Sequence, residues 1–219
     1  MKTKFNFLNG EEIEARTLYG IGSNYSKHAM EMGGVVPSEP VIFIKPAVAL
    51  IGDNEKINIP DFSQNVHHEL ELIVIIGIDC SNIDRTEAHK YIAGYGVGLD
   101  ITLRDIQNKA KTEGKPWAVC KGFRTSAPVS AIVPVSHLSD PLSNFEINLW
   151  VNGELRQTGL TAEMERPVDL LIEYLSKVFS LRRGDCIFTG TPEGVGRIIS
   201  GDTLKAELRG YVSLNVSVE

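Results

Sequence analysis

Residues 67–77 read His67-His68-Glu69-Leu70-Glu71-Leu72-Ile73-Val74-Ile75-Ile76-Gly77. The apolar, β-branched run that ends at Gly77 predicts a buried strand. Side chains at positions i and i+2 of a strand face the same side, about 6.5–7 Å apart, so Glu69 and Glu71 would share one face. Two carboxylates against an apolar interior are costly unless a cation neutralises them, and their oxygens suit a divalent ion of the magnesium or manganese type. The alternative is an edge strand whose two glutamates face water.

The two histidines before these acids suggest a histidine-rich metal site only superficially. Neighbouring residues on a strand point to opposite faces, so at most His67 shares the side of the acids. We therefore predict structural or supporting roles for His67 and His68.

A third carboxylate lies in a second apolar run, residues 91–102. Asp100 stands where this strand would end and a helix over residues 103–110 would begin, and ligands are commonly gathered at such junctions. Thr102 is expected to cap that helix, with Asp105 three residues later completing an approximate capping pattern.

Two further polar residues would share one face of this helix. Arg104 and Gln107 are three positions apart, so both can reach the same ligand. The alternative pairs Arg104 with an acid on the surface.

A short helix is predicted within residues 22–34, capped by Ser23 or Asn24 and ended by a pair of glycines. His28 and Glu31 fall on one side of it, close enough for the carboxylate to orient the imidazole. The alternative is a solvated pair. The flanking glycines suit a lid that orders over bound substrate.

Two more features suggest anion binding. Lys121 lies among apolar residues, and a buried lysine needs an anion nearby. In residues 189–196, glycines let backbone N–H groups approach an anion closely, although the loop matches neither a P-loop nor a dinucleotide fingerprint. A tight turn between strands is the rival interpretation.

The remaining pattern is one of many short strands and few helices, which predicts a β-rich α+β fold and excludes a doubly wound sheet. Hairpins are expected at Asn9-Gly10 and Asn152-Gly153, and an amphipathic helix over residues 167–179. Short strands are expected over residues 41–46, 186–188 and around Arg209-Gly210. We expect residues 1–20 to form a short N-terminal strand segment and residues 21–219 a single catalytic domain.

Bulk properties narrow the class of protein. The 219 residues are 42% hydrophobic and 23% charged, as in ordinary globular proteins, with a net charge of −6 that disfavours nucleic acid and anionic membranes as partners. There is no apolar run of about 20 residues, nor a signal-peptide core. Three scattered cysteines show no metal-binding spacing and predict reduced thiols in a cytoplasmic protein.

Together, these motifs resemble the fumarylacetoacetate hydrolase superfamily, most closely its short members of the fumarylacetoacetate hydrolase domain-containing protein 1 type. The resemblance runs from Gly20 to the C-terminus. It rests on Glu69-x-Glu71, Asp100 with Arg104-Asp105-Ile106-Gln107, Lys121-Gly122-Phe123, and Phe188-Thr189-Gly190-Thr191-Pro192-Glu193-Gly194-Val195-Gly196. It implies a mixed β-sandwich roll of the family's C-terminal-domain type that pairs into a homodimer. Arg124 departs from the pattern, since many members have aspartate there.

The resemblance also implies a site and a reaction. Mg²⁺ or Mn²⁺, with Ca²⁺ as a substitute in crystals, would be held by three ligands: Glu69, Glu71 and Asp100. The substrate would be an acylpyruvate, a 2,4-dioxo acid such as fumarylpyruvate or acetylpyruvate, whose C–C bond is hydrolysed. The His28–Glu31 pair would deprotonate a water, and the metal and Lys121 would stabilise the departing pyruvate enolate. Substrate contacts are expected from Arg104, Gln107 and Thr191, the last of these with the substrate carboxylate.

Other activities fit the same residues. Oxaloacetate bound in the same way would lose carbon dioxide or interconvert keto and enol forms, so a decarboxylase or a tautomerase/isomerase is the alternative. The sequence does not choose between them. A metal-stabilised binding protein without turnover would need only the three acids, and the presence of His28, Glu31 and Lys121 together argues against it.

Overall fold

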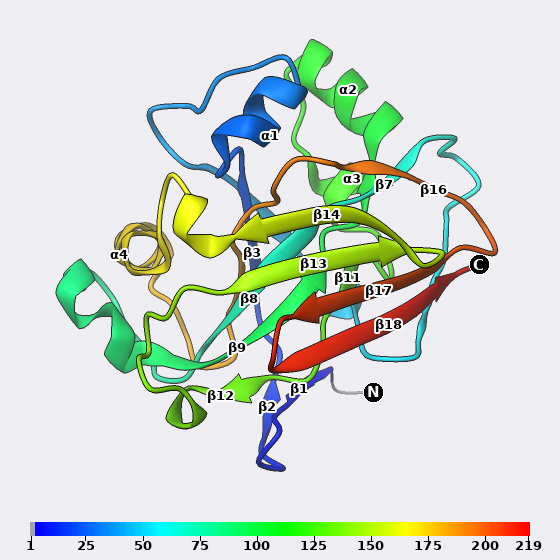
Figure 1. The fold of residues 1–219 in the computed structure, drawn as a ribbon. Coiled ribbons are helices and arrows are strands. Elements are labelled where there is room, and N and C mark those ends of the chain that lie inside the picture. Colours follow the sequence, from blue (N-terminus) through cyan, green and yellow to red (C-terminus); the bar gives the residue numbers. More distant parts are fainter. Residues whose placement is uncertain (1–2) are drawn as a thin grey trace.

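Two sheets form the framework of the computed structural model, which describes residues 3–219 (Figure 1). The larger sheet has six strands in the order β12-β9-β8-β15-β3-β4. Its strands are β3 (Leu18–Gly22), β4 (Val41–Lys45), β8 (Leu70–Ile76), β9 (Ile92–Leu99), β12 (Val133–Pro134) and β15 (Cys186–Phe188). The other has five strands in the order β14-β13-β17-β18-β6. Its strands are β6 (Lys56–Ile57), β13 (Glu146–Val151), β14 (Glu154–Leu160), β17 (Thr203–Leu208) and β18 (Val212–Val218).

Strand β8 lies at the centre of the fold, because β9 and β15 pair with its two edges and apolar layers cover both faces. Every residue of β8 is buried, as its apolar sequence predicts. Leu72 and Val74 belong to the main core, which also contains the inward residues of β13 and β17. Ile73 and Ile75 pack instead in a second cluster with phenylalanines of the N-terminal segment. The buried strand predicted from residues 67–77 is therefore confirmed from Leu70 onward.

Three small sheets complete the strand network. A hairpin pairs β1 (Lys4–Asn6) with β2 (Glu12–Glu14), and β11 (Ala127–Pro128) pairs with β5 (Leu50–Ile51). The third sheet has the order β10-β7-β16 and consists of β7 (Val66–His68), β10 (Thr102–Leu103) and β16 (Gly196–Ile198). This sheet holds together three segments that lead into the loops around the candidate site.

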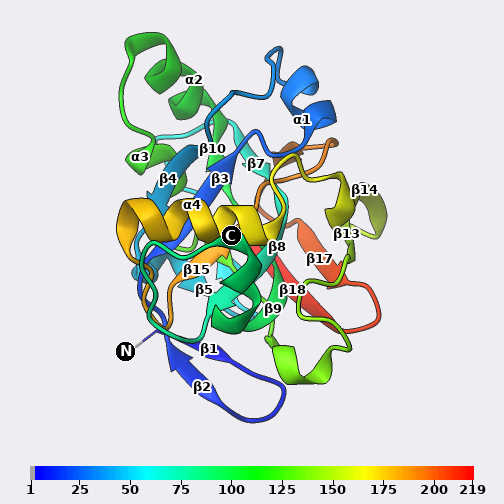
Figure 2. The same ribbon diagram turned by 90° about the vertical axis from the view of Figure 1, so that its left-hand side faces the viewer.

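The helices lie at one end and one side of the sheets. Figures 1 and 2 both show α1, α2 and α3 at the upper end, while α4 lies along one side. The helices are α1 (Ser26–Glu31), α2 (Arg104–Glu113), α3 (Ala118–Lys121) and α4 (Val168–Phe179), with 3₁₀ turns η1 (Ala47–Ala49), η2 (Arg85–Tyr91), η3 (Val135–His137) and η4 (Thr161–Glu163). Across residues 3–219, the helices are too short or too polar to cross a membrane.

The predicted turns and the amphipathic helix are confirmed. Asn9-Gly10 closes the β1–β2 hairpin, and Asn152-Gly153 closes β13–β14. Helix α4 begins directly after Pro167 and buries Leu171 and Leu175. The expected boundary at residue 20 falls inside β3, and the division into a segment and a domain stays a prediction.

The predicted helix caps are wrong. The N-cap residues of α1 and α2 are Tyr25 and Leu103, and neither makes a side-chain capping bond. Thr102 lies in β10, where its hydroxyl donates to the carbonyl of Asp100. Asn24 is used elsewhere, because its amide donates to the carbonyls of Arg166 and Thr189.

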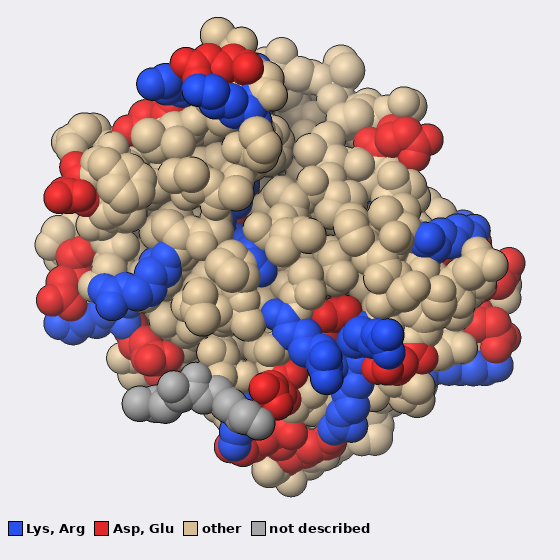
Figure 3. Space-filling view, turned by 180° about the vertical axis from the view of Figure 1, so that it is seen from behind, with Lys and Arg blue, Asp and Glu red and all other residues tan. Residues whose placement is uncertain are grey.

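Figure 3 shows the back of the molecule, where a broad area is free of Lys, Arg, Asp and Glu. Charged side chains of both signs gather around its margins.

Candidate active site

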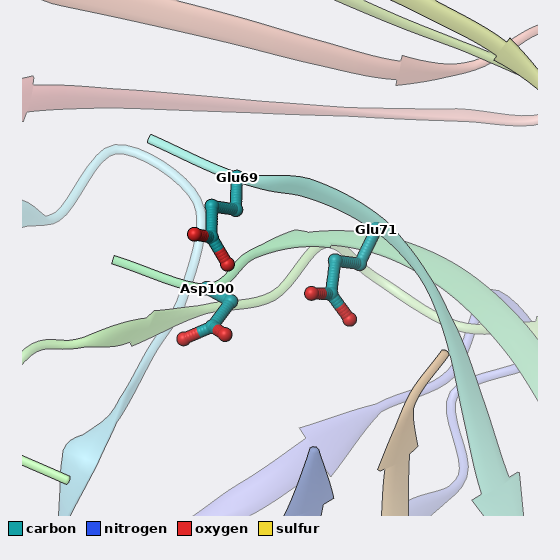
Figure 4. A group of neighbouring side chains, drawn as sticks. All are labelled: Glu69, Glu71 and Asp100. Carbon is teal, nitrogen blue, oxygen red and sulfur yellow. The ribbon is translucent and has the colours of Figure 1, made fainter. Parts of the chain in front are cut away.

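Three carboxylates meet where β8 begins and β9 ends (Figure 4). Glu69 occupies the one-residue gap between β7 and β8, Glu71 is the second residue of β8, and Asp100 directly follows β9. The antiparallel pairing places Glu71 opposite Gly98, so the start of one strand lies beside the end of the other. One oxygen from each carboxylate lies within 4.8 Å of the others. The predicted continuous strand is therefore interrupted at Glu69, yet its two glutamates still turn toward Asp100.

The three acids are almost fully removed from solvent. Glu69, Glu71 and Asp100 are 5%, 1% and 0% exposed. The predicted alternative, an edge strand whose glutamates face water, is therefore wrong.

Three basic side chains surround two of the acids. Lys121, at the end of α3, donates from Nζ to Glu69 Oε2 at 2.7 Å and also contacts Asp100. Arg104 pairs with the other oxygen of Glu69, and Lys45 Nζ lies 2.7 Å from Asp100 Oδ1. The predicted burial of Lys121 beside an anion is confirmed, and its anions are carboxylates of the protein itself.

Glu71 differs because no Lys or Arg of residues 3–219 lies within ion-pair distance of it. Its Oε2 accepts a hydrogen bond of 2.7 Å from the backbone N–H of Gly190. Burial, followed by the negative charges of Asp100 and Glu69, raises the pKa of Glu71 well above its ordinary value. At Glu69 burial also acts to raise the pKa, but Lys121 and Arg104 outweigh it and the pKa is lowered. The negative charge of the cluster is therefore not balanced by a basic side chain at Glu71.

This donor set fits a hard divalent ion. The ligands are carboxylate oxygens, which suit Mg²⁺ or Mn²⁺, and the uncompensated charge of Glu71 would be offset by the ion. Among the described residues, these three form the group of Asp, Glu, His or Cys side chains whose ligand atoms lie close enough together to hold an ion. Glu69, Glu71 and Asp100 are therefore the residues that would hold it.

The loop after β15 brings its backbone N–H groups to two carboxylates. Gly190 has φ +99°, and a Cβ there would lie 2.7 Å from Cβ of Asn24, so the position requires glycine. Its N–H binds Glu71, and the N–H of Gly194 donates to Glu31 at 3.1 Å. The loop therefore does approach anions, and they belong to the protein's own side chains.

The predicted pair on α1 is formed. His28 Nδ1 lies 3.2 Å from Glu31 Oε2, and His28 is only 7% exposed. Because Nδ1 faces the carboxylate, Nε2 is the ring nitrogen left to take a proton.

A small cavity of about 40 Å³ unites these groups. Its lining residues come from β3, α1, β4, the β7–β8 junction, α2, α3 and the loop after β15. They are Ile21, Gly22, Ser23, His28, Met32, Phe43, Glu69, Glu71, Arg104, Gln107, Lys111, Trp117, Lys121 and Thr191. A larger open hollow of about 490 Å³, lined by Trp150 and Lys205 among others, lies elsewhere on β13, β17 and β18.

Arg104 and Gln107 act as neighbours, as predicted. Both are buried, and Arg104 Nη1 donates to Gln107 Oε1 at 2.5 Å. The predicted alternative for Arg104, a surface acid, is wrong, because its partner is buried Glu69. Arg124, the departure from the family pattern, is exposed and does not line the cavity.

The two histidines have the expected structural positions. His68 Nδ1 donates to Gln157 at 2.9 Å, and His67 Nε2 lies 3.0 Å from Asn65 Oδ1. Burial, followed by the charge of Arg104, lowers the pKa of His67 to about 4.

Sequence reasoning missed Gln157, a buried residue of β14. Its Oε1 accepts from the N–H of Leu70 at 3.0 Å as well as from His68, so it fixes both neighbours of Glu69. Its Nε2 donates to Thr191 Oγ1 and to the carbonyl of Pro192, each at 2.9 Å. The one sequence signal for a buried Gln157 is the alternation of strand residues, which turns some side chains of β14 inward.

The sequence also left the role of Lys45 open. This lysine is 0% exposed and, besides Asp100, binds the carbonyl of Ser126 at 2.9 Å. It therefore contacts Oδ1 of Asp100, whereas Lys121 contacts Oδ2.

Known proteins resemble this chain over most of its length. The model of the fumarylacetoacetate (FAA) hydrolase C-terminal family matches residues 17–219. An oxaloacetate tautomerase of Escherichia coli (strain K12) is 47% identical over 191 residues, 87% of each chain. The mitochondrial oxaloacetate tautomerase of Bos taurus is 43% identical over 199 residues, covering 91% of this chain and 90% of the relative.

A solved structure is similar over nearly the whole chain. It is the fumarylpyruvate hydrolase from Pseudomonas aeruginosa in complex with Mn²⁺ and pyruvate. The two share 35% sequence identity and a TM-score of 0.95, and the match covers 99% of this chain and 95% of that one.

Proposed function

Because this chain belongs to the fumarylacetoacetate hydrolase family, we propose that it is a divalent-metal-dependent enzyme that acts on 2-oxo acids through their enolates. The favoured reaction is keto–enol interconversion of oxaloacetate, since two relatives of 43% and 47% identity are named for it. Acylpyruvate hydrolysis is the reaction that the sequence resemblance implies first, and the names of these two relatives support putting oxaloacetate first in this proposal. The observation that carries the proposal is the convergence of Glu69, Glu71 and Asp100, two of which line one cavity together with Lys121 and His28.

In this reaction the protein must move a proton away from C3 of the 2-oxo acid and stabilise the charge left on the C2 oxygen. His28 takes the C3 proton at Nε2, while Glu31 holds Nδ1 and fixes the orientation of the ring. Lys121 supplies an ammonium group beside the developing negative oxygen. The C2 oxygen is then protonated, so the enol differs from the ketone only in the position of one proton.

The other residues bind and orient the substrate. Thr191 lines the cavity, and so do Arg104 and Gln107, which stand on the same helix face. They would hold the C1 carboxylate and the neighbouring oxygens. Glu69, Glu71 and Asp100 would hold a divalent ion, with Mg²⁺ as the proposed physiological ion, and the ion would supply Lewis-acid polarisation of the carbonyl.

Hydrolysis of acylpyruvates is the second candidate, and the likeness to fumarylpyruvate hydrolase at a TM-score of 0.95 favours it. Here His28 would deprotonate a water, which attacks the distal carbonyl. The C3–C4 bond then breaks and pyruvate leaves as its enolate. Decarboxylation of oxaloacetate gives the same enolate without an activated water.

A substrate panel tests the proposal. The enol absorbance of oxaloacetate and the absorbance of acetylpyruvate and fumarylpyruvate are followed with Mg²⁺, with Mn²⁺ and with EDTA. We expect metal-dependent relaxation of the oxaloacetate signal, and pyruvate release shows whether hydrolysis or decarboxylation also occurs. A protein that changes none of these signals with either metal contradicts the proposed function and favours a binding role.

The oligomeric state and the cellular location are also proposals. The resemblance implies a homodimer, which light scattering would detect as twice the 24.1 kDa of one chain. The similar proteins named above include a bacterial and a mitochondrial one, so a cytoplasmic location needs fractionation of the source cells.

A further inference from the structure

One basic side chain of the cavity has no acidic partner. Lys111 lies on α2, on the same face as Arg104 and Gln107, and like them it lines the cavity. Its Nζ stands 5.4 Å from the centre of the Trp117 ring, another residue of the lining. Within residues 3–219, no carboxylate oxygen lies within 4.0 Å of Lys111 Nζ, the distance limit for an ion pair. Trp117 therefore holds a cation at the cavity with no counterion.

Lys111 is an exposed residue of the cavity lining, whereas the three carboxylates are buried. It follows Arg104 by seven residues, which places its backbone about 10 Å further along the helix axis. Unlike Arg104, which is buried against Glu69, Lys111 is still exposed to solvent. It therefore stands at the mouth.

The charges around the cavity favour an anion with two negative groups. Arg104 and Lys121 are already paired with Glu69, whereas Lys111 is not paired. Burial, followed by the positive charge of Arg104, lowers the pKa of Lys111, so its charged form lacks stabilisation that an anion would provide. Under the proposed function, the C1 carboxylate and the 2-oxo group of a substrate would lie on the side of the three acids. A second carboxylate would then extend toward the mouth.

We propose that Lys111 binds the distal carboxylate of dicarboxylic 2-oxo acids and selects them over 2-oxo acids with an uncharged end. This inference rests on the proposed function, because it takes the cavity as the site of a 2-oxo acid. The rival explanation is an ordinary surface lysine packed on a tryptophan.

Two unreactive ligands of equal chain length separate these explanations. 2-Oxoglutarate and 2-oxovalerate differ in having a carboxylate or a methyl group at C5, and neither is an acylpyruvate. Their dissociation constants are measured by calorimetry on the Mn²⁺-loaded protein. The variants are Lys111→Met, Lys111→Arg and, as a matched control, Lys109→Met. Lys109 is exposed on the same helix and does not line the cavity.

We expect Lys111→Met to weaken 2-oxoglutarate binding about tenfold, equivalent to about 1.4 kcal/mol, and to change 2-oxovalerate binding less than twofold. Lys111→Arg keeps the charge and should keep the preference, as should Lys109→Met. With oxaloacetate as substrate, Lys111→Met should raise KM and leave kcat nearly unchanged, because the contact is equal in ground and transition states.

The possible failures are distinct. Equal weakening of both ligands by Lys111→Met, or the same loss in Lys109→Met, would overturn the assignment of Lys111. A wild-type protein that binds both ligands equally well would also overturn the assignment of Lys111. That result would leave the proposed function intact. A wild-type protein that binds neither ligand in the presence of Mn²⁺ also overturns the assignment of Lys111, whereas the proposed function is contradicted only if the oxaloacetate and acylpyruvate signals of the substrate panel stay unchanged as well.

Discussion

At the scale of single residues, Glu71 and Glu69 should respond in opposite ways to loss of charge. Glu71 lies beside two other acids and has no basic partner in the described chain, whereas Glu69 pairs with Lys121 and Arg104. In the metal-free protein, Glu71→Gln should therefore maintain or raise the free energy of unfolding at neutral pH. Glu69→Gln should lower it by about 3 kcal/mol, because it leaves buried cations unpaired. Urea unfolding in EDTA measures both.

The sign of the pH dependence follows from the raised pKa of Glu71. Above about pH 4.5 the unfolded chain loses this proton while the folded chain still keeps it, so stability falls as pH rises toward the folded-state pKa. The stability of the wild type relative to Glu71→Gln should therefore decrease from pH 5 to pH 8. A difference that is constant or grows over this range contradicts the electrostatic assignment.

His28 provides a test of the proton-transfer step. His28→Ala should lower kcat for oxaloacetate tautomerisation by about 10²–10⁴-fold, the usual contribution of a general base. Its affinity for Mn²⁺ should stay within about twofold, because His28 binds Glu31 and is not one of the three clustered acids. His137→Ala, at an exposed histidine on η3, is the control. Near wild-type kcat in His28→Ala would show that another group moves the proton.

The sequence identified the site residues that have a clear chemical reason to be buried or paired. Lys121 among apolar neighbours and the two glutamates of an apolar run could be identified in this way. Lys45 and Gln157 could not, because their partners are backbone groups and side chains 34 to 89 positions away in the chain.

At the scale of elements, β14 supports the site through Gln157. Replacing it by leucine leaves the N–H of Leu70, the ring N–H of His68 and the carbonyl of Pro192 without this partner. Each such buried group costs about 1–3 kcal/mol, so Gln157→Leu should lower the free energy of unfolding by at least about 2 kcal/mol.

A separate measurement distinguishes positioning from simple stability. Because His68 and Leu70 flank Glu69, Gln157→Leu should weaken Mn²⁺ binding about tenfold, as loss of a group that orients a ligand commonly does. The control is Thr158→Val, at the exposed neighbour of Gln157. Lower stability with unchanged Mn²⁺ affinity would restrict Gln157 to a structural role.

Elements with a local cause were predictable and those with a distant cause were not. The two Asn-Gly hairpins and the start of α4 after Pro167 depend on backbone preferences of a few residues. The gap at Glu69 depends on β7, which leaves the large sheet to pair with β10 and β16. The missing side-chain cap of α2 also has a distant cause. The Thr102 hydroxyl donates to the carbonyl of Asp100 and accepts from Lys121 Nζ, so it does not cap the helix.

At the scale of the whole molecule, metal binding and folding should be coupled. The three acids come from separate places in the sheet, and the loop at Gly190 and helix α3 hold them from further segments. An unfolded chain cannot bring these groups together, so an ion that binds here stabilises only the folded state. At 100 times its dissociation constant, Mn²⁺ should add about 2.7 kcal/mol, or a rise in Tm of about 5–10 °C for a chain of this size.

Thermal unfolding with Mn²⁺ and with EDTA measures this coupling, and Glu71→Gln is the informative variant. Glu71 is the acid with an uncompensated charge, so its replacement should remove most of the Mn²⁺-dependent rise in Tm without lowering Tm in EDTA. Thr158→Val should keep the full rise. If Mn²⁺ and Mg²⁺ both leave the wild-type Tm unchanged, the three acids do not hold an ion, because three buried carboxylates that bind one cannot avoid stabilising the fold that assembles them.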